Sequence, residues 1–353
     1  MKVALIGPPK GGKTALFSAV TGMKVDAFAA PGIVHSIVRV PDPRLTYLTE
    51  ICRPKKVTEA TIEFLDVPGF AFDDPKGRDT FRRLLPDVRQ AELLVIVVRD
   101  FENPTVPAYR DRVDARADFN AMWEELLFAD LDTVTTRVER LEKALKKPSK
   151  THDFEKRELA LLTRCREALE QNKPLSTVIT QEEDRRHVAS FAFVTQKPIV
   201  CVRNTGDDRA AAEPILVDHA VASLAVCALL EAEISSLDPG DRPAFLAELG
   251  LKEPARDRLI RKCYEACGLI SFLTMGPDEV RAWTIRKGAT AAEAAGKIHS
   301  DLAQNFVRAE TVAYSELVAN RDLKGARAAG KVRKEGRGYV VSDGDILNIL
   351  ANA

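Results

Sequence analysis

Residues 7–14 read GPPKGGKT and lie between the apolar run KVALI and the helix-like run ALFSAV. The stretch fits the pattern Gly-x-x-x-x-Gly-Lys-[Ser/Thr], in which a glycine-rich loop points backbone N–H groups at an anion in front of a helix. A purely structural turn is the alternative, because a turn between a strand and a helix also favours glycine. The flanks favour a phosphate-binding loop, since an apolar strand precedes it and Leu16 and Val20 follow with helical spacing before Gly22.

The residues of this loop have predicted roles in holding a nucleotide. Lys13 is expected to neutralise the β- and γ-phosphates and thereby to act in catalysis, and the Thr14 hydroxyl is expected to bind Mg²⁺. The candidate nucleotide-binding residues are Gly7, Pro8, Pro9, Lys10, Gly11, Gly12, Lys13, Thr14 and Ala15.

A second strand ends in a motif that would complete the phosphate end of the site. The stretch TIEFLDVPGF predicts a strand followed by Asp66 and Gly69 in Asp-x-x-Gly spacing. In nucleotide hydrolases such an Asp reaches the Mg²⁺ shell, and the N–H of such a Gly contacts the γ-phosphate. We therefore expect Asp66 to join Thr14 as a metal ligand, and Gly69 to act in catalysis as the γ-phosphate sensor.

Two later strands end in residues suited to the nucleobase. The stretch KPIVCVRNTGDD predicts a strand at 199–202 that is followed by Asn204 and Asp207. The stretch LAVCALL places Cys227 and Ala228 after another short strand. The Asp207 carboxylate could accept two hydrogen bonds from a guanine edge, which an adenine edge does not offer. Because the carboxyl ends of parallel strands meet at one edge of a sheet, these residues are predicted to share a site with the loop.

The composition is that of an ordinary globular protein with two or three domains. The 353 residues carry 52 Lys+Arg against 52 Asp+Glu, so only a local patch, not the whole chain, is expected to attract polyanions. The six cysteines are widely spaced and form no Cys-x-x-Cys pair, which predicts reduced, mostly buried thiols and no zinc site. No apolar run reaches the roughly 18 residues of a membrane helix. The first strand begins at once, without a signal peptide, so we expect a cytoplasmic protein.

The chain as a whole resembles the YchF family, the Obg-like ATPases among the translation-factor-related GTPases. The resemblance is carried, in the family's order, by GPPKGGKT (7–14), VPDPRL (40–45), FLDVPGF (64–70), VVRDFENP (97–104), ADLDTV (129–134), FVTQKP (193–198) and EVRAWTIRKGATAAEAAGKIHSDLAQNFVRAE (279–310). It implies an α/β, P-loop NTPase (G-domain) fold with an inserted α-helical hairpin and a C-terminal small α+β TGS-type (ubiquitin-like) domain. The implied boundaries are 1–122 plus 198–270 for the G domain, 123–197 for the hairpin and 271–353 for the TGS-type domain.

The resemblance also implies an activity and a partner. It implies a P-loop NTPase that binds ATP and/or GTP with Mg²⁺, hydrolyses it slowly, and acts as a nucleotide-dependent switch linked to the ribosome and translation. The ribosome or RNA would contact the TGS-type domain and the hairpin. Two alternatives stay open: a nucleotide-binding module that has lost hydrolysis, and an RNA-binding scaffold in which nucleotide is only structural.

Residue patterns support both added parts. Apolar residues at three- and four-residue steps predict two antiparallel helices, the first with Leu131, Val134, Val138, Leu141 and Leu145 and the second with Leu162, Cys165 and Leu169. A hairpin that only buries its own seam is as consistent with this pattern as a partner-binding arm. The stretch 321–338 carries seven Lys/Arg against Asp322 and Glu335, which predicts either a solvated loop or an RNA-facing surface.

The chain departs from the family pattern at the base and after the first helix. The family's Asn-x-x-Glu goes with ATP and ordinary GTPases carry Asn-Lys-x-Asp, whereas this chain has Asn-Thr-Gly-Asp at 204–207. Both nucleotides therefore stay open, and the resemblance slightly favours ATP. The family usually presents a Thr to Mg²⁺ where this chain has Ala30, and Ser36 is the only hydroxyl in that segment. This predicts weaker γ-phosphate sensing unless Ser36 or a water substitutes.

Further departures concern catalysis. Phe70 stands where ordinary small GTPases carry a water-orienting Gln, which implies slow intrinsic turnover. One of Arg78, Arg82 and Arg83 would reach the γ-phosphate, or all three face solvent, as exposed arginines commonly do. Lys10 stands where the family typically has Asn, which in related GTPases helps to hold a monovalent cation between the α- and γ-phosphates. Our hypothesis is that the Lys10 ammonium takes the place of that cation, and the alternative is that it points to solvent.

Overall fold

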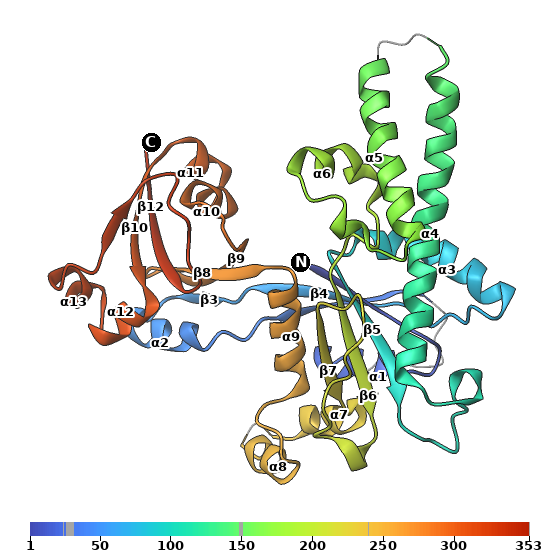
Figure 1. Ribbon diagram of the computed structural model, residues 1–353. Helices are drawn as coiled ribbons and strands as arrows, with labels where there is room; N and C mark the ends of the chain where they lie inside the picture. The colour runs from blue at the N-terminus through green and yellow to red at the C-terminus, as the bar shows by residue number, and fades with distance from the viewer. Residues whose placement is uncertain (24, 26–31, 148–150, 239, 353) are drawn as a thin grey trace. The chain divides into compact units, whose positions relative to one another are not determined.

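The computed structural model describes residues 1–23, 25, 32–147, 151–238 and 240–352. Contacts divide the chain into two compact units, and Figure 1 labels most of their elements. Unit 1 comprises Met1–Ser36 and Glu63–Leu259, and unit 2 comprises Ile37–Ile62 and Ile260–Ala353.

A six-stranded sheet forms the centre of unit 1, with strands β1 (Lys2–Ile6), β2 (Val34–Arg39), β4 (Thr61–Asp66), β5 (Leu93–Asp100), β6 (Ile199–Thr205) and β7 (Ala222–Val226). The order is β2-β4-β1-β5-β6-β7, and the pairs β1/β4, β1/β5, β5/β6 and β6/β7 are parallel. Residues 93–98 of β5 are fully buried, as expected for a central parallel strand with both faces covered. The carboxyl ends of these parallel strands meet at one edge, which confirms the predicted α/β fold class.

Helices α1 (Lys13–Thr21), α3 (Pro75–Gln90) and α6 (Glu182–Val188) lie in the connections between these strands. Helices α7 (Ala228–Ser236), α8 (Arg242–Glu248) and α9 (Ala255–Ala266) follow β7, and α9 continues into unit 2. Helix α1 ends at Gly22, whose left-handed backbone (φ 71°) lets its N–H cap the Ser18 carbonyl. Helix α3 begins after Asp74, whose carboxylate accepts a hydrogen bond from the N–H of Lys76. Helices α1 and α7 pack against each other.

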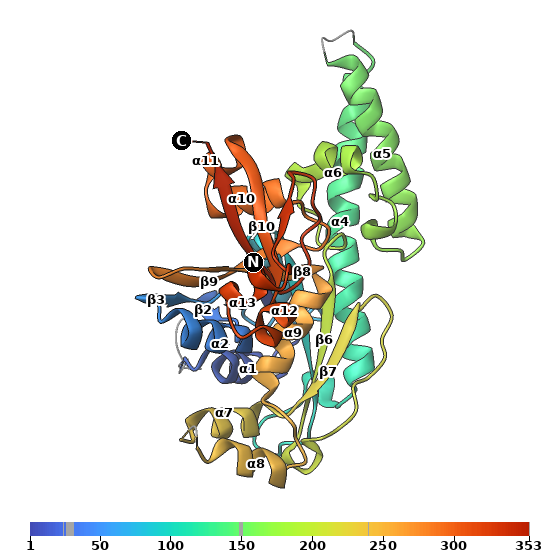
Figure 2. The same ribbon diagram turned by 90° about the vertical axis from the view of Figure 1, so that its left-hand side faces the viewer.

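The predicted hairpin is formed by α4 (Ala115–Ala144) and α5 (His152–Glu170), which lie side by side in Figures 1 and 2. Most of the predicted stripe is buried, namely Val134, Val138, Leu141, Leu162, Cys165 and Leu169. Arg137 of α4 donates to both carboxylate oxygens of Glu158 on α5, at 2.8 and 2.7 Å. Helix α4 begins earlier than the predicted residue 123 because the Asp114 carboxylate caps it by accepting from the N–H of Ala117. No helix in the described part of the chain is long and apolar enough to cross a membrane.

A buried carboxylate fixes the base of the hairpin. Asp130 of α4 is fully buried and accepts hydrogen bonds from the N–H of Val194 and from the N–H and Oγ1 of Thr195, at 3.2, 2.8 and 2.8 Å. Burial raises the pKa of Asp130, and these donors and Arg89 oppose that shift. The stretches ADLDTV and FVTQKP, far apart in the sequence, therefore form one structural feature.

Unit 2 contains a second six-stranded sheet, with strands β3 (Lys56–Thr58), β8 (Leu269–Met275), β9 (Glu279–Arg286), β10 (Phe306–Ala313), β11 (Arg333–Glu335) and β12 (Asp345–Ala351). The order is β11-β10-β12-β8-β9-β3, with β12/β8 and β3/β9 parallel and the remaining pairs antiparallel. Its helices are α2 (Pro43–Cys52), α10 (Ala291–Ile298), α11 (Ser300–Gln304), α12 (Tyr314–Ala319) and α13 (Leu323–Ala328). Helix α10 starts with a capping box of Thr290 and Glu293. This is the predicted C-terminal α+β part.

Residues 37–62 group with the C-terminal part of the chain, which differs from the predicted division. Strand β3 pairs in parallel with β9. Arg44 of α2 donates to Asp343 at 2.8 Å, and the other carboxylate oxygen of Asp343 accepts from the N–H of Ser271. The boundaries implied by the resemblance assigned 37–62 to the G domain, and no local pattern in the sequence indicates the pairing of this segment with the distant C-terminal strands. The hairpin groups with unit 1, and the boundary of the hairpin as a separate domain stays a prediction.

Candidate nucleotide-binding site

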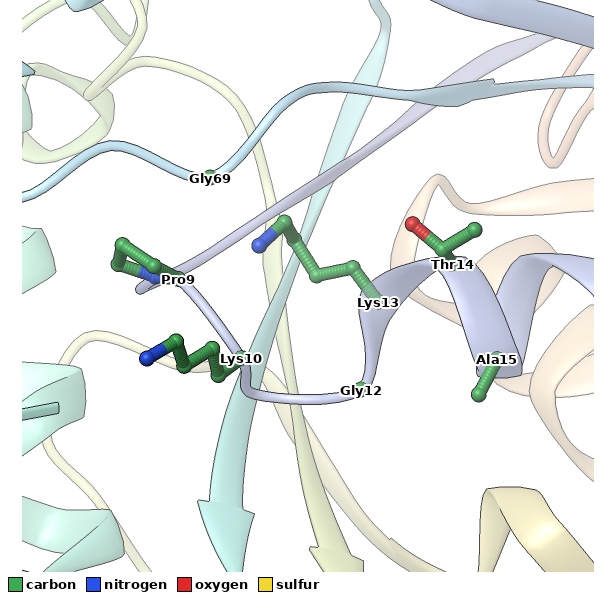
Figure 3. A pocket seen from close by; sticks show the side chains of 7 residues that line it. All are labelled: Pro9, Lys10, Gly12, Lys13, Thr14, Ala15 and Gly69. Carbon is green, nitrogen blue, oxygen red and sulfur yellow. The ribbon is translucent and has the colours of Figure 1, made fainter. Parts of the chain in front are cut away.

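The loop of residues 7–12 leads from β1 into α1 and lies close against neighbouring strands (Figure 3). A β-carbon at Gly7 would lie 2.3 Å from the Val97 carbonyl oxygen of β5. One at Gly12, where φ is 87°, would lie 2.0 Å from Asn204 Nδ2 of β6. Glycine at both positions therefore lets the loop bring the start of α1 to the carboxyl edge of the sheet.

A hollow of about 290 Å³ opens at this edge. Its lining, shown in Figure 3, consists of Pro9, Lys10, Gly12, Lys13, Thr14, Ala15 and Gly69. The other candidate loop residues, Gly7, Pro8 and Gly11, are buried and lie outside this lining. In the part of the chain that the structure describes, the lining carries two lysines and no acidic side chain. The first turn of α1 also has N–H groups without a partner within the helix, so the hollow suits an anion.

Lys13 is the buried cation of this hollow. Its side chain is 5% exposed, and Nζ donates to the carbonyl oxygens of Gly7 and Pro8 at 3.1 and 2.8 Å. Burial lowers the pKa of Lys13 to about 8, and the carboxylate of Asp66 opposes that shift. A phosphate would supply the anionic contact partner that this buried ammonium lacks within the loop.

Thr14 and Asp66 meet beside the hollow. Thr14 Oγ1 donates to Asp66 Oδ2 at 2.7 Å, whereas Asp66 Oδ1 is buried without a hydrogen-bond partner in the described chain. Burial raises the pKa of Asp66, and the Thr14 hydrogen bond and the Lys13 charge oppose that shift. An unpartnered carboxylate oxygen beside a hydroxyl is a donor set that fits a hard cation such as Mg²⁺. Among the described residues, no group of three or more His, Cys, Asp or Glu side chains could hold a metal ion by itself. An ion at Thr14 and Asp66 would therefore need further ligands from outside the protein.

Gly69 lies directly over the loop. A β-carbon at this position would lie 2.8 Å from both Lys13 Nζ and Pro9 Cα. The next residue, Phe70, is 1% exposed and packs against the rings of Phe72 and Phe81, with centroids 5.1 and 4.8 Å away. Phe70 is therefore directed into the core, and it does not line the hollow.

The three arginines that follow are not part of the hollow. Arg78, Arg82 and Arg83 are exposed on α3 and absent from the lining. Arg82 lies 3.6 Å from Asp79, and the charge of Arg78 acts on Glu125 of α4, where it opposes the rise in pKa that burial causes. The structure favours the interpretation in which these arginines face solvent.

Asn204 connects two predicted parts of the site, the glycine loop and the residues at the start of α7. Its Nδ2 donates to the Gly11 carbonyl at 3.1 Å, and its Oδ1 accepts from the N–H of Ala228 at 3.0 Å. The amide is 4% exposed, so it holds the glycine loop to the start of α7. Cys227, directly before α7, is also buried, which raises the pKa of its thiol.

Asp207 lies on an exposed turn after β6. Its Oδ1 accepts from the N–H of Asp208 at 3.0 Å. The turn is anchored by Arg209, which donates to the carbonyl and carboxylate of Asp100, and Arg203 binds the same carboxylate. Sequence reasoning missed this anchor, and the only signal for it was the stretch VVRDFENP, which contains Asp100.

Lys10 lines the hollow together with Lys13. Figure 3 shows the two lysine side chains on different sides of Pro9. Its side chain is exposed and makes no hydrogen bond or ion pair in the described chain. The Lys10 backbone is left-handed, with φ of 60°, which is unfavourable for a residue with a β-carbon.

The segment with the missing threonine includes Ala30 and Ser36. Ala30 lies outside the described residues, so its predicted effect stays a prediction. Ser36 is half-buried in β2 and does not line the hollow.

The parallel sheet, the glycine loop and the Thr14–Asp66 pair define a P-loop NTPase fold. Two curated proteins named "Ribosome-binding ATPase YchF" are similar to the whole chain. The protein of Bacillus subtilis (strain 168) is 36% identical over 367 residues, which cover 100% of this chain and 99% of the relative. The protein of Escherichia coli O157:H7 is 36% identical over 362 residues and covers 99% of each. This chain therefore belongs to the YchF family.

A family model and a solved structure agree with this assignment. The family YchF-GTPase_C, described as "Protein of unknown function (DUF933)", matches residues 269–352. A structure described as that of the Schizosaccharomyces pombe YchF GTPase superposes with a TM-score of 0.82 at 25% identity, covering 99% of this chain and 97% of that one.

Proposed function

We propose that this protein is a nucleoside triphosphatase that binds ATP and/or GTP with Mg²⁺, hydrolyses it slowly and acts as a nucleotide-dependent switch at the ribosome. The observation that carries this proposal is the hollow in which Lys13, Thr14 and Gly69 converge at the start of α1. The names of the full-length relatives support both the activity and the partner.

Thr14 and Asp66 would hold the Mg²⁺ ion. The support is the buried Asp66 Oδ1 without a partner, next to the Thr14 hydroxyl. The ion supplies positive charge against the phosphate oxygens when it is bound.

The residues of the chain act by position and charge. Lys13 stabilises negative charge on the phosphates, and the N–H of Gly69 is a donor for the terminal phosphate. Among the described residues, the lining contains no carboxylate, histidine or cysteine that could accept a proton from water, and Phe70 is directed into the core. Slow turnover follows, because only positioning and electrostatics accelerate the reaction.

Substitution of Asp207 tests which nucleobase the protein binds. Purified nucleotide-free protein is titrated with fluorescent ATP and GTP analogues in Mg²⁺, and the titration is repeated with Asp207→Ala. Tight GTP binding that is lost in the variant assigns Asp207 to guanine. ATP binding that survives the change supports an ATPase. Binding of neither nucleotide would overturn the proposed function.

A module that binds nucleotide without hydrolysis is the second candidate, and the buried Phe70 is the observation that favours it. A turnover assay at high excess of nucleotide, with and without ribosomes, separates the two. Less than one phosphate released per protein in both conditions would establish the second candidate.

The predicted RNA-facing stretch is partly self-paired. Within 321–338, contacts inside unit 2 hold four basic side chains, namely Arg327 to Glu310, Lys331 to Glu316, Arg333 to Tyr339 and Arg337 to the Ala303 carbonyl. Arg321, Lys324 and Lys334 are exposed and make no ion pair in the described chain. We propose that these three charges face ribosomal RNA, in a protein of the cytoplasm. RNA affinity that ignores nucleotide state would instead favour the scaffold alternative.

A further inference from the structure

The segment before α4 contacts the loop that follows Gly69, and we infer that Tyr109 is a positioning residue for the γ-phosphate sensor. The inference rests on the proposed function, because it concerns how Gly69 is held against Lys13. All the residues involved lie in unit 1.

The Tyr109 hydroxyl is both a donor and an acceptor in this contact. It accepts a hydrogen bond from the N–H of Phe72 at 3.3 Å and donates to Asp73 Oδ1 at 3.3 Å. The Arg110 guanidinium lies 5.0 Å from the centroid of the Tyr109 ring and 3.9 Å from Asp73 Oδ2. The phenol therefore binds a backbone group and a side chain of two successive residues shortly after Gly69.

The turn that presents Tyr109 has an unfavourable backbone. Arg110 (φ 55°, ψ 30°) and Asp111 (φ 51°) are both left-handed, although neither is glycine. Such a conformation persists only where surrounding contacts fix it, and it concentrates in functional segments. Here the contacts to Asp73 fix one side of the turn, and the cap of α4 at Asp114 follows directly on the other.

The loop after Gly69 is held from two sides. Phe72 is 4% exposed, and its ring packs edge-to-face on Phe81 with centroids 5.6 Å apart, so the core holds one side. Tyr109 is half-buried and holds the other side. Gly69 comes directly before this anchored segment and lies over the phosphate-binding loop of residues 7–12. It is so close to that loop that a β-carbon on Gly69 would lie 2.8 Å from Lys13 Nζ.

A shift of this loop therefore changes where the N–H of Gly69 lies relative to Lys13 Nζ, and both groups would contact the terminal phosphate. Asn204 is held by other partners, the Gly11 carbonyl and the N–H of Ala228, so the loss of the Tyr109 hydroxyl leaves the hydrogen bonds of Asn204 in place. Loss of the hydroxyl should consequently weaken triphosphate binding and turnover, while diphosphate binding stays unchanged.

The test is Tyr109→Phe, which keeps the ring beneath Arg110 and removes both hydrogen bonds. Calorimetry with Mg²⁺ measures the Kd of a non-hydrolysable triphosphate analogue and of the diphosphate. We expect the triphosphate Kd to rise about three- to tenfold, the range that the loss of a hydrogen bond gives, with kcat falling in parallel. The diphosphate Kd should stay within about twofold.

Tyr47→Phe is the matched control, since its hydroxyl also donates one hydrogen bond, to the Arg321 carbonyl of unit 2 at 2.9 Å. It should leave the ratio of the two Kd values unchanged. Asp73→Ala removes the acceptor but keeps the phenol, and serves if Tyr109→Phe does not fold. The role of Tyr109, but not the proposed function, would be overturned by either of two results. One is an unchanged ratio of triphosphate to diphosphate Kd in both site variants, and the other is an equal loss of affinity for both nucleotides. Absence of nucleotide binding in the unaltered protein would overturn the proposed function as well.

Discussion

At the scale of single residues, the proposed role of Lys13 predicts that nucleotide binding depends on pH. Its burial lowers the pKa from 10.5 to about 8, and a bound triphosphate favours the charged form and raises that pKa again. Above about pH 8 each binding event should therefore take up a proton, and affinity should fall by up to about tenfold per pH unit. Calorimetry in two buffers of different ionisation enthalpy measures this uptake, and binding at about pH 9 without it would contradict the buried ammonium.

The same pKa shift gives a stability effect of defined sign in the nucleotide-free protein. The unfolded chain holds the Lys13 proton up to a pKa of 10.5 and the folded chain only to about 8. Between these values the unfolded state binds more protons, so the contribution of Lys13 to the free energy of unfolding rises with pH across that window. Lys13→Met should remove this pH dependence, and denaturant unfolding from about pH 7.5 to 10.5 compares the two proteins.

Lys10 gives a second prediction at this scale. Its ammonium lines the hollow and has no partner in the described chain, so we expect it to supply the charge that a monovalent cation would otherwise bring. Turnover should then be equal in K⁺ and Na⁺, whereas Lys10→Asn should become dependent on K⁺. Steady-state phosphate release in the two salts at matched ionic strength is the measurement. A preference for K⁺ in the unaltered protein as strong as in the variant would refute this role.

At the scale of elements, the hairpin contains a buried ion pair across its seam. Glu158 is 3% exposed and receives two hydrogen bonds from Arg137, so Arg137→Ala leaves a buried carboxylate without its partner. We expect the free energy of unfolding of the hairpin to fall by about 2 kcal/mol, because hydrogen bonds to a buried charge are among the stronger side-chain contacts. Hydrogen exchange of α4 and α5 amides reports this loss. Arg140→Ala, an exposed arginine on the same helix, is the control and should change little.

The same elements show what the sequence could predict. The glycine loop, the strand ending at Asp66 and the buried stripe through Val138 follow from local spacing, because each belongs to one strand, turn or helix. The contact of Arg209 with Asp100, which anchors the turn of Asp207, and the contact of Tyr109 with Phe72 join segments that are far apart along the chain. Side-chain contacts of that kind depend on how the chain packs and leave no periodic pattern in the sequence.

At the scale of the whole molecule, the division into units does not follow the sequence order of the motifs. Residues 37–62 belong to unit 2 although they lie between the glycine loop and Asp66 in the sequence. The chain enters this segment through β2 and leaves it through β4, whose last residue is Asp66. Part of unit 2 is therefore encoded between two motifs of the nucleotide site, which a division by consecutive domains cannot capture.

The proposed ribosome contact of unit 2 predicts a specific salt dependence. Arg321, Lys324 and Lys334 are exposed without an ion pair in the described chain, so each is available to a phosphate. Each phosphate contact contributes about 0.7 to 0.9 to the slope of log affinity against log salt, and replacing all three by Ala should lower that slope by about two. Ribosome co-sedimentation across a salt series measures it.

The control for this experiment is Arg327→Ala with Lys331→Ala, two basic residues of the same stretch that are paired with Glu310 and Glu316. Because their charges are partly neutralised within unit 2, the double variant should lower the slope by less than one. The contrast separates the two interpretations of the stretch, since a solvated loop would give no change in either variant. Equal changes in both would mean that the total charge of the stretch, and not its three unpaired side chains, attracts the RNA.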